Sequence, residues 1–587
     1  MIQRICIPTV LMSIAATCAI AAVQGAAKET PMDQLMHTYT LSDDRTPDAY
    51  DEAMAVACLQ GLINRDRPRL YVLSRADAHP EYWLRVLSQE ERWLSERQPE
   101  SVADLDGLVA LAKDRLKGVV IWDPDVPATV NVATTIAGVE DGVVLSPAMA
   151  DRYLAAWQLP VLADLRGRFT GAETGSAKND AYRWAIREYL AKGLCSAHLL
   201  CLYEDAFTTR ARGDTGYVLT RDWAVLNRAF VLDLSPWGDE KPADDPEQPL
   251  GTDLETYHLL LQATLGQSAG EQMTELAGFF AFAKYSNVPG HESAHDPVPT
   301  EWETVHLISP YNCYQNTIAS SCFNQSLHSQ APRRPLKQHR PSEALELADK
   351  TYLCFLMADY DSATPLYAFL PNHWDDPRRG EIPLAWGINP NLIETFPDLF
   401  SYLYATASAN DYFTADASAA GYMNPNRIEE RYLPLFVRHN QRFFREADMT
   451  IAPMVLDWDE PTGKVKDAFT QFAPDGFATI VMDLHGTGGK SPKPHVWKGM
   501  PVTNLINNAC NFSNAEQTGA IIASCLEGQR PGVPGFHFFR VVWTGPTQII
   551  DTVTRLRQAR PDLDIEVVDP YTFFRLLKQH LGERTRQ

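Results

Sequence analysis

Short apolar runs alternate with helix-like patterns along most of the chain. The segment 53–63 has a helical pattern, whereas residues 69–73 form an apolar run of the length that builds a buried strand. Strands that alternate with helices are typical of α/β proteins with parallel sheets, so we expect an α/β fold. The other expected elements are a helix over 82–93 and strands over 118–122, 142–145 and 199–203.

Three apolar runs, at 352–357, 454–456 and 480–482, each end at an acid that a second polar residue follows two positions later. Since alternate residues of a strand face the same way, both members of a pair can point into one space. If the strands are parallel neighbours, the pairs gather at the edge where α/β folds hold their active sites. The alternative is structural, because an Asp after a buried strand can cap a helix or begin a turn. The candidate catalytic residues are Asp359, Asp361, Asp457, Asp459, Asp483 and His485.

The length of the chain indicates several domains. A chain of 587 residues with 45% hydrophobic content is too long for one core. Residues 331–344 combine three prolines with basic side chains, which is typical of a solvated, semi-rigid linker. Prolines also mark 236–251 as a surface loop. We expect an N-terminal α/β domain over 38–190, a second α/β domain over 191–330 and a C-terminal domain over 345–583 that holds the acid pairs.

The N-terminus has the pattern of an export signal. Arg4 precedes an uncharged apolar stretch over 5–23, and the small residues at 25–27 offer a cleavage site. We therefore expect residues 1–27 to be removed and the product to be secreted or periplasmic; a lipoprotein anchored at Cys18 is the alternative. No later stretch has the ~20 uncharged apolar residues that cross a bilayer, so no membrane insertion is expected after cleavage.

Charge and cysteine content narrow the classes of partner. The chain has 74 Asp and Glu against 52 Lys and Arg, which argues against a nucleic-acid partner and against anionic membrane surfaces. Its cysteines are sparse and lack C-x-x-C spacing, which argues against a zinc site or a disulfide-built scaffold. Local disulfides between Cys195 and Cys201, or between Cys313 and Cys322, stay unassigned. We expect no cofactor.

Eight segments along the chain carry a family resemblance: 59–65, 131–133, 300–303, 374–380, 383–386, 410–411, 418–425 and 567–574. They resemble the GxGYxYP family of putative glycoside hydrolases, and the resemblance covers most of the mature chain. It implies a secreted bacterial protein with N-terminal α/β domains, followed by a C-terminal irregular (β/α) barrel-like catalytic domain. It also implies a carbohydrate substrate.

The chain departs from the family motif at two positions. Ala419 stands for the first Gly and Asn424 for the second Tyr, whereas Gly421, Tyr422 and Pro425 match. Alanine can replace glycine where φ is negative, so we expect the first change to be silent unless the backbone approaches a ligand. Asn424 lacks an aromatic face and would alter sugar stacking if it lines the cleft. A non-catalytic carbohydrate-binding protein is therefore one alternative function.

Glycoside hydrolysis requires one carboxylic acid that protonates the departing oxygen and one carboxylate that acts as nucleophile or activates water. Their separation is ~5 Å in retaining and ~6.5–9.5 Å in inverting enzymes. We favour a cross-strand pair, in which Asp483 or Asp457 is the partner of Asp359 or Asp361. The proton donor should be the acid in the more apolar place, because burial raises a carboxyl pKa. His485 could orient one acid or shuttle protons.

A metal-dependent carbohydrate deacetylase is the second alternative, because Asp-x-Asp and Asp-x-His at strand ends can also bind a metal. Within the expected C-terminal domain, 345–583, no histidine pair at i, i+4 completes such a site, so we assign no metal ligands. Aromatic and amide side chains could contact a sugar substrate, although some of the aromatic ones could equally be core residues. The candidate substrate-binding residues are Trp374, Trp386, Tyr422, Asn424, Trp458 and Trp497.

Overall fold

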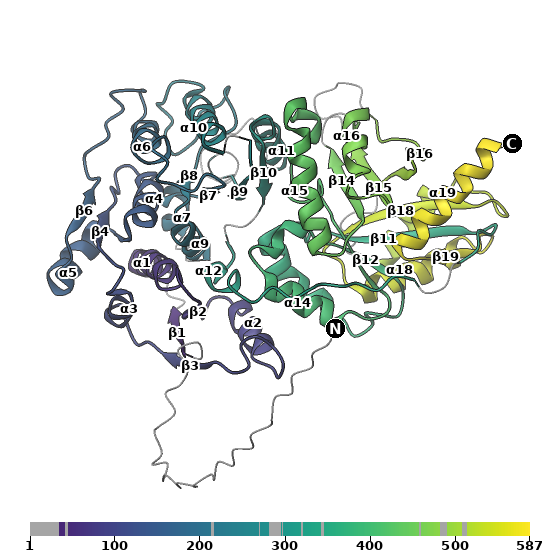
Figure 1. The fold of residues 1–587 in the computed structure, drawn as a ribbon, viewed down its shortest axis with the longest axis horizontal. Coiled ribbons are helices and arrows are strands. Elements are labelled where there is room, and N and C mark those ends of the chain that lie inside the picture. The colour runs from purple at the N-terminus through teal and green to yellow at the C-terminus, as the bar shows by residue number, and fades with distance from the viewer. Residues whose placement is uncertain are drawn as a thin grey trace, which may run out of the picture.

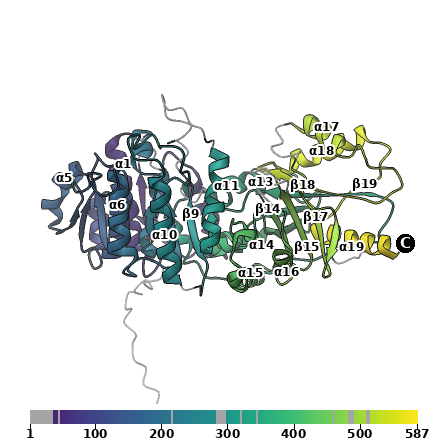
Figure 2. The same cartoon turned by 90° about the horizontal axis from the view of Figure 1, so that it is seen from above.

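The computed structural model places the chain in two halves, an N-terminal half over 35–328 and a C-terminal half over 351–586 (Figure 1). The two halves lie side by side in both perpendicular ribbon views (Figure 2). The expected export signal lies outside the described residues. The structure describes residues 35–41, 45–212, 216–268, 270–280, 284, 295, 297–317, 321–341, 345–456, 460–481, 490–507 and 514–586.

The N-terminal half contains three small sheets whose described strand pairs are all parallel, with orders β2-β1-β3, β5-β4-β6 and β10-β9-β7-β8. Two of these sheets subdivide the region 38–190. The strands are β1 (Leu35–Leu41), β2 (Leu70–Ser74), β3 (Gln98–Ser101), β4 (Gly118–Ile121), β5 (Gly142–Leu145), β6 (Val161–Asp164), β7 (Leu199–Leu202), β8 (Phe230–Leu232), β9 (Thr274–Gly278) and β10 (Cys313–Asn316).

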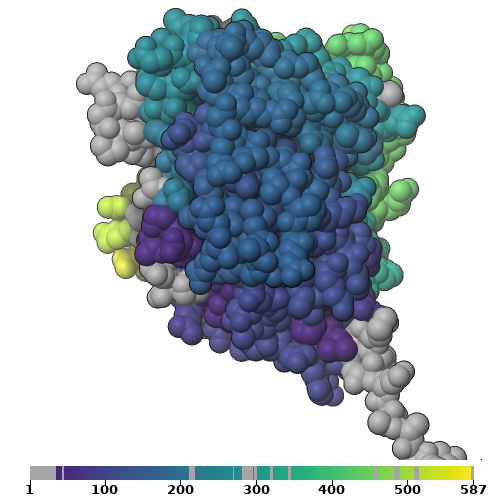
Figure 3. Space-filling model, turned by 90° about the vertical axis from the view of Figure 1, so that its left-hand side faces the viewer, coloured from purple at the N-terminus to yellow at the C-terminus, as the bar shows by residue number. Residues whose placement is uncertain are grey.

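Helices cover these sheets (Figure 2), and Figure 3 shows the outer surface of the N-terminal half in purple and blue. The expected helix 82–93 ends early, at Leu87, because the chain turns at Glu91 with φ +67° and Leu94 N returns to bond Leu87 O at 3.1 Å. The helices are α1 (Pro47–Ile63), α2 (His79–Leu87), α3 (Leu105–Ala112), α4 (Thr129–Glu140), α5 (Pro147–Trp157), α6 (Ala177–Ala185), α7 (Ala206–Arg212), α8 (Gly216–Leu219), α9 (Arg221–Asn227), α10 (Thr252–Ser268), α11 (Pro297–Ile308) and α12 (Gln325–His328).

Helix α1 shows how sequence produces this packing. Thr46 caps its N-terminus by accepting a hydrogen bond from Ala49 N at 3.3 Å, and Pro47 opens the first turn, where its missing N–H costs nothing. Gly61 lets α9 approach, because a Cβ there would lie 2.6 Å from Asp222 O. The small residues of α1 therefore permit close helix contact in the core.

A buried charge cluster joins strand ends of this half to the loop 236–251. Lys284 Nζ lies 2.7 Å from Asp233, 2.9 Å from Asp244 and 3.1 Å from Asp205. The expected surface loop thus contributes a buried side chain, Asp244, which pairs with the buried charge of Lys284. The described cysteines, including Cys195, Cys201, Cys313 and Cys322, are free thiols.

The C-terminal half contains a parallel sheet of order β13-β12-β11-β18, with β19 beside β11, and a second sheet of order β14-β15-β17-β16. A few backbone hydrogen bonds link the two sheets. One runs from Ala415 N to Ile451 O (3.3 Å), and two join Ile506 to β18, from Ile506 N to Phe538 O (2.8 Å) and from Arg540 N to Ile506 O (3.0 Å). The strand pairing resolves two sheets, so the barrel-like form stays a prediction. The strands are β11 (Thr351–Ala358), β12 (Leu384–Gly387), β13 (Asp411–Thr414), β14 (Ile451–Leu456), β15 (Gly476–Val481), β16 (His495–Trp497), β17 (Met500–Asn504), β18 (Gly535–Val542) and β19 (Ile565–Val567).

Parallel pairing sets the direction of the strand ends. β11 is buried along its whole length between β12 and β18. β14, β15 and β17 are mutually parallel, and a parallel bridge from Ile506 to Phe539 connects them to β18. The carboxyl ends of these strands therefore point the same way. The helices of this half are α13 (Leu370–Trp374), α14 (Pro397–Thr406), α15 (Leu433–Glu446), α16 (Gly463–Phe469), α17 (Ala515–Cys525), α18 (Pro546–Ala559) and α19 (Pro570–Arg586).

The proline-rich segment 331–341 is exposed at 332–335, as expected of a solvated linker, but it is anchored to β13 at Gln338. Gln338 is buried, and its side-chain amide donates to Phe413 O and accepts from Phe413 N, both at 3.0 Å. It satisfies polar groups of β13 that would otherwise lack partners at the strand edge. Within the part of the chain that the structure describes, no helix is long and apolar enough to span a bilayer.

Candidate active site

Two acids and one cation meet at the ends of β11, β13 and β18. Asp359 directly follows β11, Asp416 lies two residues after β13, and Arg540 lies near the end of β18. Because these strands belong to one parallel sheet, the three positions lie along the same edge. Asp361, two positions after Asp359, joins them electrostatically. We call Asp359, Asp361 and Asp416 the acid cluster.

Asp359 has an unusual backbone conformation that three contacts hold. Its φ is +67°, in the left-handed region that costs a non-glycine residue about 1–3 kcal/mol. Its N–H donates to Asp416 Oδ2 (2.5 Å), and its carbonyl accepts from the indole N–H of Trp543 (3.0 Å). Its carboxylate accepts a hydrogen bond from Arg540. Such an outlier, fixed from three sides, is typical of a functional site.

Asp416 is the buried member of the acid cluster, with 1% of its surface exposed. Asn389 accepts from its backbone N–H at 3.0 Å. Gly387 leaves room for its carboxyl group, because a Cβ at that position would lie 2.9 Å from Asp416 Oδ2. Among the described residues, Asp416 Oδ1 has no hydrogen-bond partner. Through its other oxygen, Oδ2, Asp416 holds the backbone of Asp359.

The surroundings raise the pKa of two of the three acids. Burial raises the pKa of Asp361 to about 7, the charge of Asp359 adds to this shift, and Arg540 opposes it. Burial, followed by the charges of Asp359 and Asp361, raises the pKa of Asp416 well above its usual value. Carboxyls this close titrate as a coupled set. At neutral pH the cluster thus retains at least one proton, a state suited to acid–base chemistry.

Arg540 connects the acid cluster to the second sheet. Its guanidinium donates to Asp359 and, at 2.9 Å, to Asn507 Oδ1. Asn507 follows β17, so the contact spans the two sheets of the C-terminal half. A guanidinium can bind both partners because its donors are fixed in one plane.

Five candidate residues lie outside the described residues: Asp457, Trp458, Asp459, Asp483 and His485. The strands that lead to them are adjacent, and Leu456 at the end of β14 is in register with Val481 at the end of β15. Their assignment stays a prediction.

Trp374 and Trp386 lie in the core, which corrects the expectation that they bind substrate. Both are buried, and their rings contact each other at a centroid distance of 5.0 Å. The indole N–H of Trp374 donates to Thr406 Oγ1 (3.0 Å) and that of Trp386 to Asp411 Oδ1 (2.8 Å). Buried indoles with satisfied N–H groups stabilise the fold and offer no face to a sugar.

The motif residues Tyr422 and Asn424 are also buried and join the two halves. Tyr422 forms a backbone bridge with Gln315 of β10 and packs against Val305. Asn424 accepts a hydrogen bond from Asn426 N at 3.1 Å and so caps a short 3₁₀ turn. Neither side chain lines an open cleft here, so the loss of a tyrosine at position 424 removes no exposed stacking surface.

Ala419 corrects the expectation of a silent replacement. Its φ is +79°, and Ser418 before it has φ +55°, so alanine occupies a conformation that glycine adopts more easily. Ala419 also forms a backbone bridge with Asp416. The substitution therefore places strain directly beside the acid cluster.

Trp497 lies in β16, partly exposed and away from these contacts. Its N–H donates to Asp467 Oδ1 (2.9 Å), and Lys466 Nζ lies 4.3 Å from its ring centre. The contacts with α16 explain its position, and a role in substrate binding stays a prediction.

Sequence reasoning missed Asp416, Arg540 and Trp543. β13 has only four residues and begins with Asp411, so it gave no clear apolar run before Asp416. Arg540 offered the strongest signal, because a charged residue interrupts the apolar run 538–542. In the described part of the chain, no group of three or more His, Cys, Asp or Glu side chains is arranged to hold a metal ion.

One solved structure supports the fold. A crystal structure described as a putative hydrolase from Bacteroides thetaiotaomicron VPI-5482 has a TM-score of 0.69 and 17% identity, over 93% of this chain and 96% of that chain. At this identity the similarity shows a shared fold alone. A structure described as a putative polysaccharide deacetylase from Mycobacterium smegmatis covers 43% of this chain and 96% of its own, with 10% identity and a TM-score of 0.28, too low to support an argument. No curated protein matched the chain.

Family models match most of the sequence. Residues 36–114 match the GxGYxYP_N first domain, residues 116–194 match the GxGYxYP_N second domain, and residues 349–578 match the domain described as the GxGYxYP putative glycoside hydrolase C-terminal domain. The third region contains the whole acid cluster together with Arg540. Because three GxGYxYP domain models match in order along the sequence, the chain belongs to the GxGYxYP family.

Proposed function

We propose that this protein is a glycoside hydrolase that cleaves an oligo- or polysaccharide at the acid cluster. The observation that carries the proposal is Asp359, which three contacts hold in a left-handed conformation beside Asp361, a carboxyl with a pKa near 7. Two carboxyls in different surroundings are what glycoside hydrolysis needs. The description of the C-terminal family model supports the same reaction class.

The proposed proton donor is Asp361. Its raised pKa keeps a large fraction protonated at neutral pH. The residue as a whole is less buried than Asp416, which leaves a path to a bound substrate. It would protonate the glycosidic oxygen as the bond to the anomeric carbon breaks. Asp359, paired with Arg540, would supply the negative charge that stabilises the oxocarbenium-like sugar.

Asp416 is a positioning residue in this proposal, because it is buried and acts through the backbone of Asp359. Asp457 and Asp483 remain the proposed cross-strand carboxylates that activate water. β14 and β15, which lead to them, end side by side in the same direction as β11. We retain His485 and Asp459 as proposed members of that second group.

The test compares Asp361→Asn and Asp359→Asn with the wild-type protein on gluco-, xylo-, manno- and N-acetylglucosamine hexasaccharides, with mass spectrometry of the products. Loss of the proton donor should lower kcat by about 10²–10⁴-fold, with little change in affinity. Asp551→Asn is the matched control, because Asp551 is an exposed acid of the same half that pairs with Arg378 at 2.8 Å. It should retain full activity.

The same experiment has outcomes that would contradict the proposal. Equal turnover by the wild-type protein and both variants would exclude the acid cluster as the site of cleavage. Release of acetate from acetylated sugars, abolished by a chelator, would replace the proposal with a metal-dependent deacetylase. Binding without any product would indicate a carbohydrate-binding protein instead.

A further inference from the structure

We propose that Trp543 is the stacking platform that holds a pyranose ring of the substrate beside the acid cluster. This inference rests on the proposed function and specifies how the site selects its substrate. It assigns a binding role to a residue outside the GxGYxYP motif, in the turn between β18 and α18 (Figure 1).

Trp543 is exposed where an indole would normally be buried. Its relative exposure is 41%, and of the aromatic side chains that the structure describes it is the most exposed. Exposing an indole forgoes favourable apolar burial, and here the exposed ring lies directly beside the acid cluster, because its N–H bonds Asp359 O. Trp374 and Trp386, in the same half, show the usual buried environment.

The indole is fixed in direction as well as exposed. Its N–H donates to Asp359 O at 3.0 Å, and its ring meets Phe369 edge-to-face at a centroid distance of 4.8 Å and an angle of 71°. Its backbone has φ +45°, a second non-glycine outlier at the same site. A side chain that is already ordered loses little entropy when a ligand binds.

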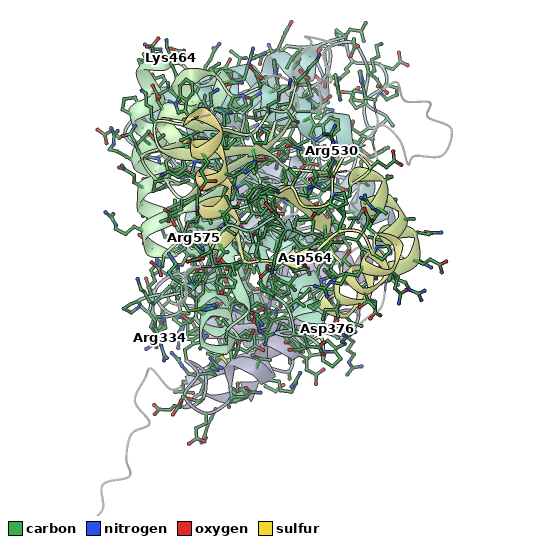
Figure 4. All side chains as sticks on the ribbon, turned by 90° about the vertical axis from the view of Figure 1, so that its right-hand side faces the viewer. Arg334, Asp376, Lys464, Arg530, Asp564 and Arg575 are labelled. Atoms are coloured by element: carbon green, nitrogen blue, oxygen red, sulfur yellow. The ribbon has the colours of Figure 1, made fainter. Side chains whose placement is uncertain are left out.

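The turn that presents Trp543 is held at its far end. Asp376 accepts hydrogen bonds from Thr547 N (3.1 Å) and Thr547 Oγ1 (2.7 Å), which ties the start of α18 to the turn after α13. Asp376 is labelled in Figure 4, close to the yellow helices of the C-terminal half. Trp543 therefore lies between two anchored points, Asp359 and the N-terminus of α18.

These contacts favour a sugar ring over other ligands. A pyranose has a face of C–H groups that packs on a flat aromatic ring, while its hydroxyls stay available for polar contacts. Because the indole N–H bonds directly to the residue that carries the proposed stabilising carboxylate, a ring stacked on Trp543 lies next to the acids. We expect rings with equatorial substituents, such as glucose or xylose units, to bind best. An axial hydroxyl projects from the C–H face of the ring and prevents close packing on the indole.

The test measures binding separately from turnover. Trp543→Ala and Trp543→Phe are each placed in the Asp361→Asn protein, and affinity for the four hexasaccharides is measured by calorimetry. We expect Trp543→Ala to weaken binding of the preferred sugar about 10-fold, equal to about 1.4 kcal/mol. Trp543→Phe keeps an aromatic face but loses the N–H donor. It should retain most of the affinity in the Asp361→Asn protein but lower kcat when Asp361 is present, because Asp359 loses one of its three contacts.

Trp157→Ala is the matched control, because Trp157 is a partly exposed tryptophan of α5 in the N-terminal half. It should leave affinity unchanged. Unfolding temperatures of all variants show whether each one folds. Unchanged affinity in Trp543→Ala, with turnover in the wild-type protein, would overturn this inference and leave the proposed function intact. If the wild-type protein neither binds nor cleaves any of the sugars, the proposed function fails, and this inference fails with it.

Discussion

Asp359 and Asp361 are two positions apart but have different surroundings. Asp359 pairs with Arg540 and bonds through its backbone to Asp416 and Trp543. Asp361 accepts a hydrogen bond from Ser362 at 3.3 Å, and burial raises its pKa to about 7. At the scale of single residues, the site therefore separates a paired carboxylate from a carboxyl that holds its proton, which is the division of roles that acid catalysis requires.

Activity should depend on pH through Asp361. If Asp361 donates the proton, kcat/KM should fall tenfold per pH unit once the pH exceeds about 7, because the protonated fraction falls in that proportion. A pH profile on the best hexasaccharide measures this. A profile that is flat from pH 6 to 9 would contradict the assignment of Asp361 as proton donor.

The same shift predicts how stability changes with pH. Because the folded-state pKa of Asp361 is raised, the folded protein binds its proton more tightly than the unfolded chain does. The resulting stabilisation is complete below about pH 4 and is lost as the pH rises through about 7. Asp361→Asn, which carries no charge at any pH, should therefore unfold at a higher temperature than the wild-type protein at pH 8 but not at pH 4.

The motif segment 416–427 acts as one element that connects the acid cluster to the N-terminal half. It begins at Asp416, passes through two residues with positive φ at 418 and 419, and then bridges to β10 through Tyr422. Gly421 has φ +101°, and a Cβ there would lie 2.1 Å from the ring of Tyr314. The matched glycine and tyrosine of the motif are thus explained by packing between the halves.

Restoring the motif glycine should stabilise the protein. Ala419→Gly relieves an alanine at φ +79°, for an expected gain of about 0.5–1 kcal/mol after the greater freedom of glycine in the unfolded chain is subtracted. Ala420→Gly is the matched control and should destabilise by about 0.5–1 kcal/mol. Gly421→Ala should destabilise by about 1–3 kcal/mol or more, because the new methyl group meets Tyr314. Chemical denaturation measures the stability of all three variants. Equal effects of Ala419→Gly and Ala420→Gly would contradict the assignment of strain to Ala419.

At the scale of the whole molecule, the two halves share a continuous apolar core that includes residues of both. Trp83 of α2 illustrates the contact: it is fully buried, and its indole N–H donates to Tyr367 O of the C-terminal half at 2.7 Å. Its ring also lies 5.8 Å from that of Tyr402 in α14. We therefore expect the halves to depend on each other for stability.

Trp83→Ala tests this dependence. Removal of a buried tryptophan at this contact should cost about 3–5 kcal/mol. Differential scanning calorimetry should show one transition at a lower temperature, or two transitions if the halves separate. Trp157→Ala, which removes a partly exposed indole, should change the unfolding temperature far less. An unchanged transition in Trp83→Ala would show that the contact contributes little.

The pattern of apolar runs was sufficient to predict the α/β class, the strand 142–145 and the strand before Asp359, because the periodicity of apolar residues is a local property of the sequence. It also indicated Asp359 and Asp361, since acids at the end of a buried strand stand out. The prediction that Trp374 and Trp386 bind substrate was wrong, because the local sequence around a tryptophan does not show whether the side chain is buried or exposed.

Asp416, Arg540 and Trp543 became members of the site only in the tertiary structure. Along the sequence, Asp416 is 57 positions from Asp359, Arg540 is 181 and Trp543 is 184. The local sequence does not indicate contacts between residues so far apart. The positive φ of Asp359 and Ala419 likewise depends on bonds made by distant segments. The sequence alone thus indicated the alternation of strands and helices and the acids at the end of β11, whereas long-range parallel pairing decided which side chains surround these acids and therefore which acid keeps its proton.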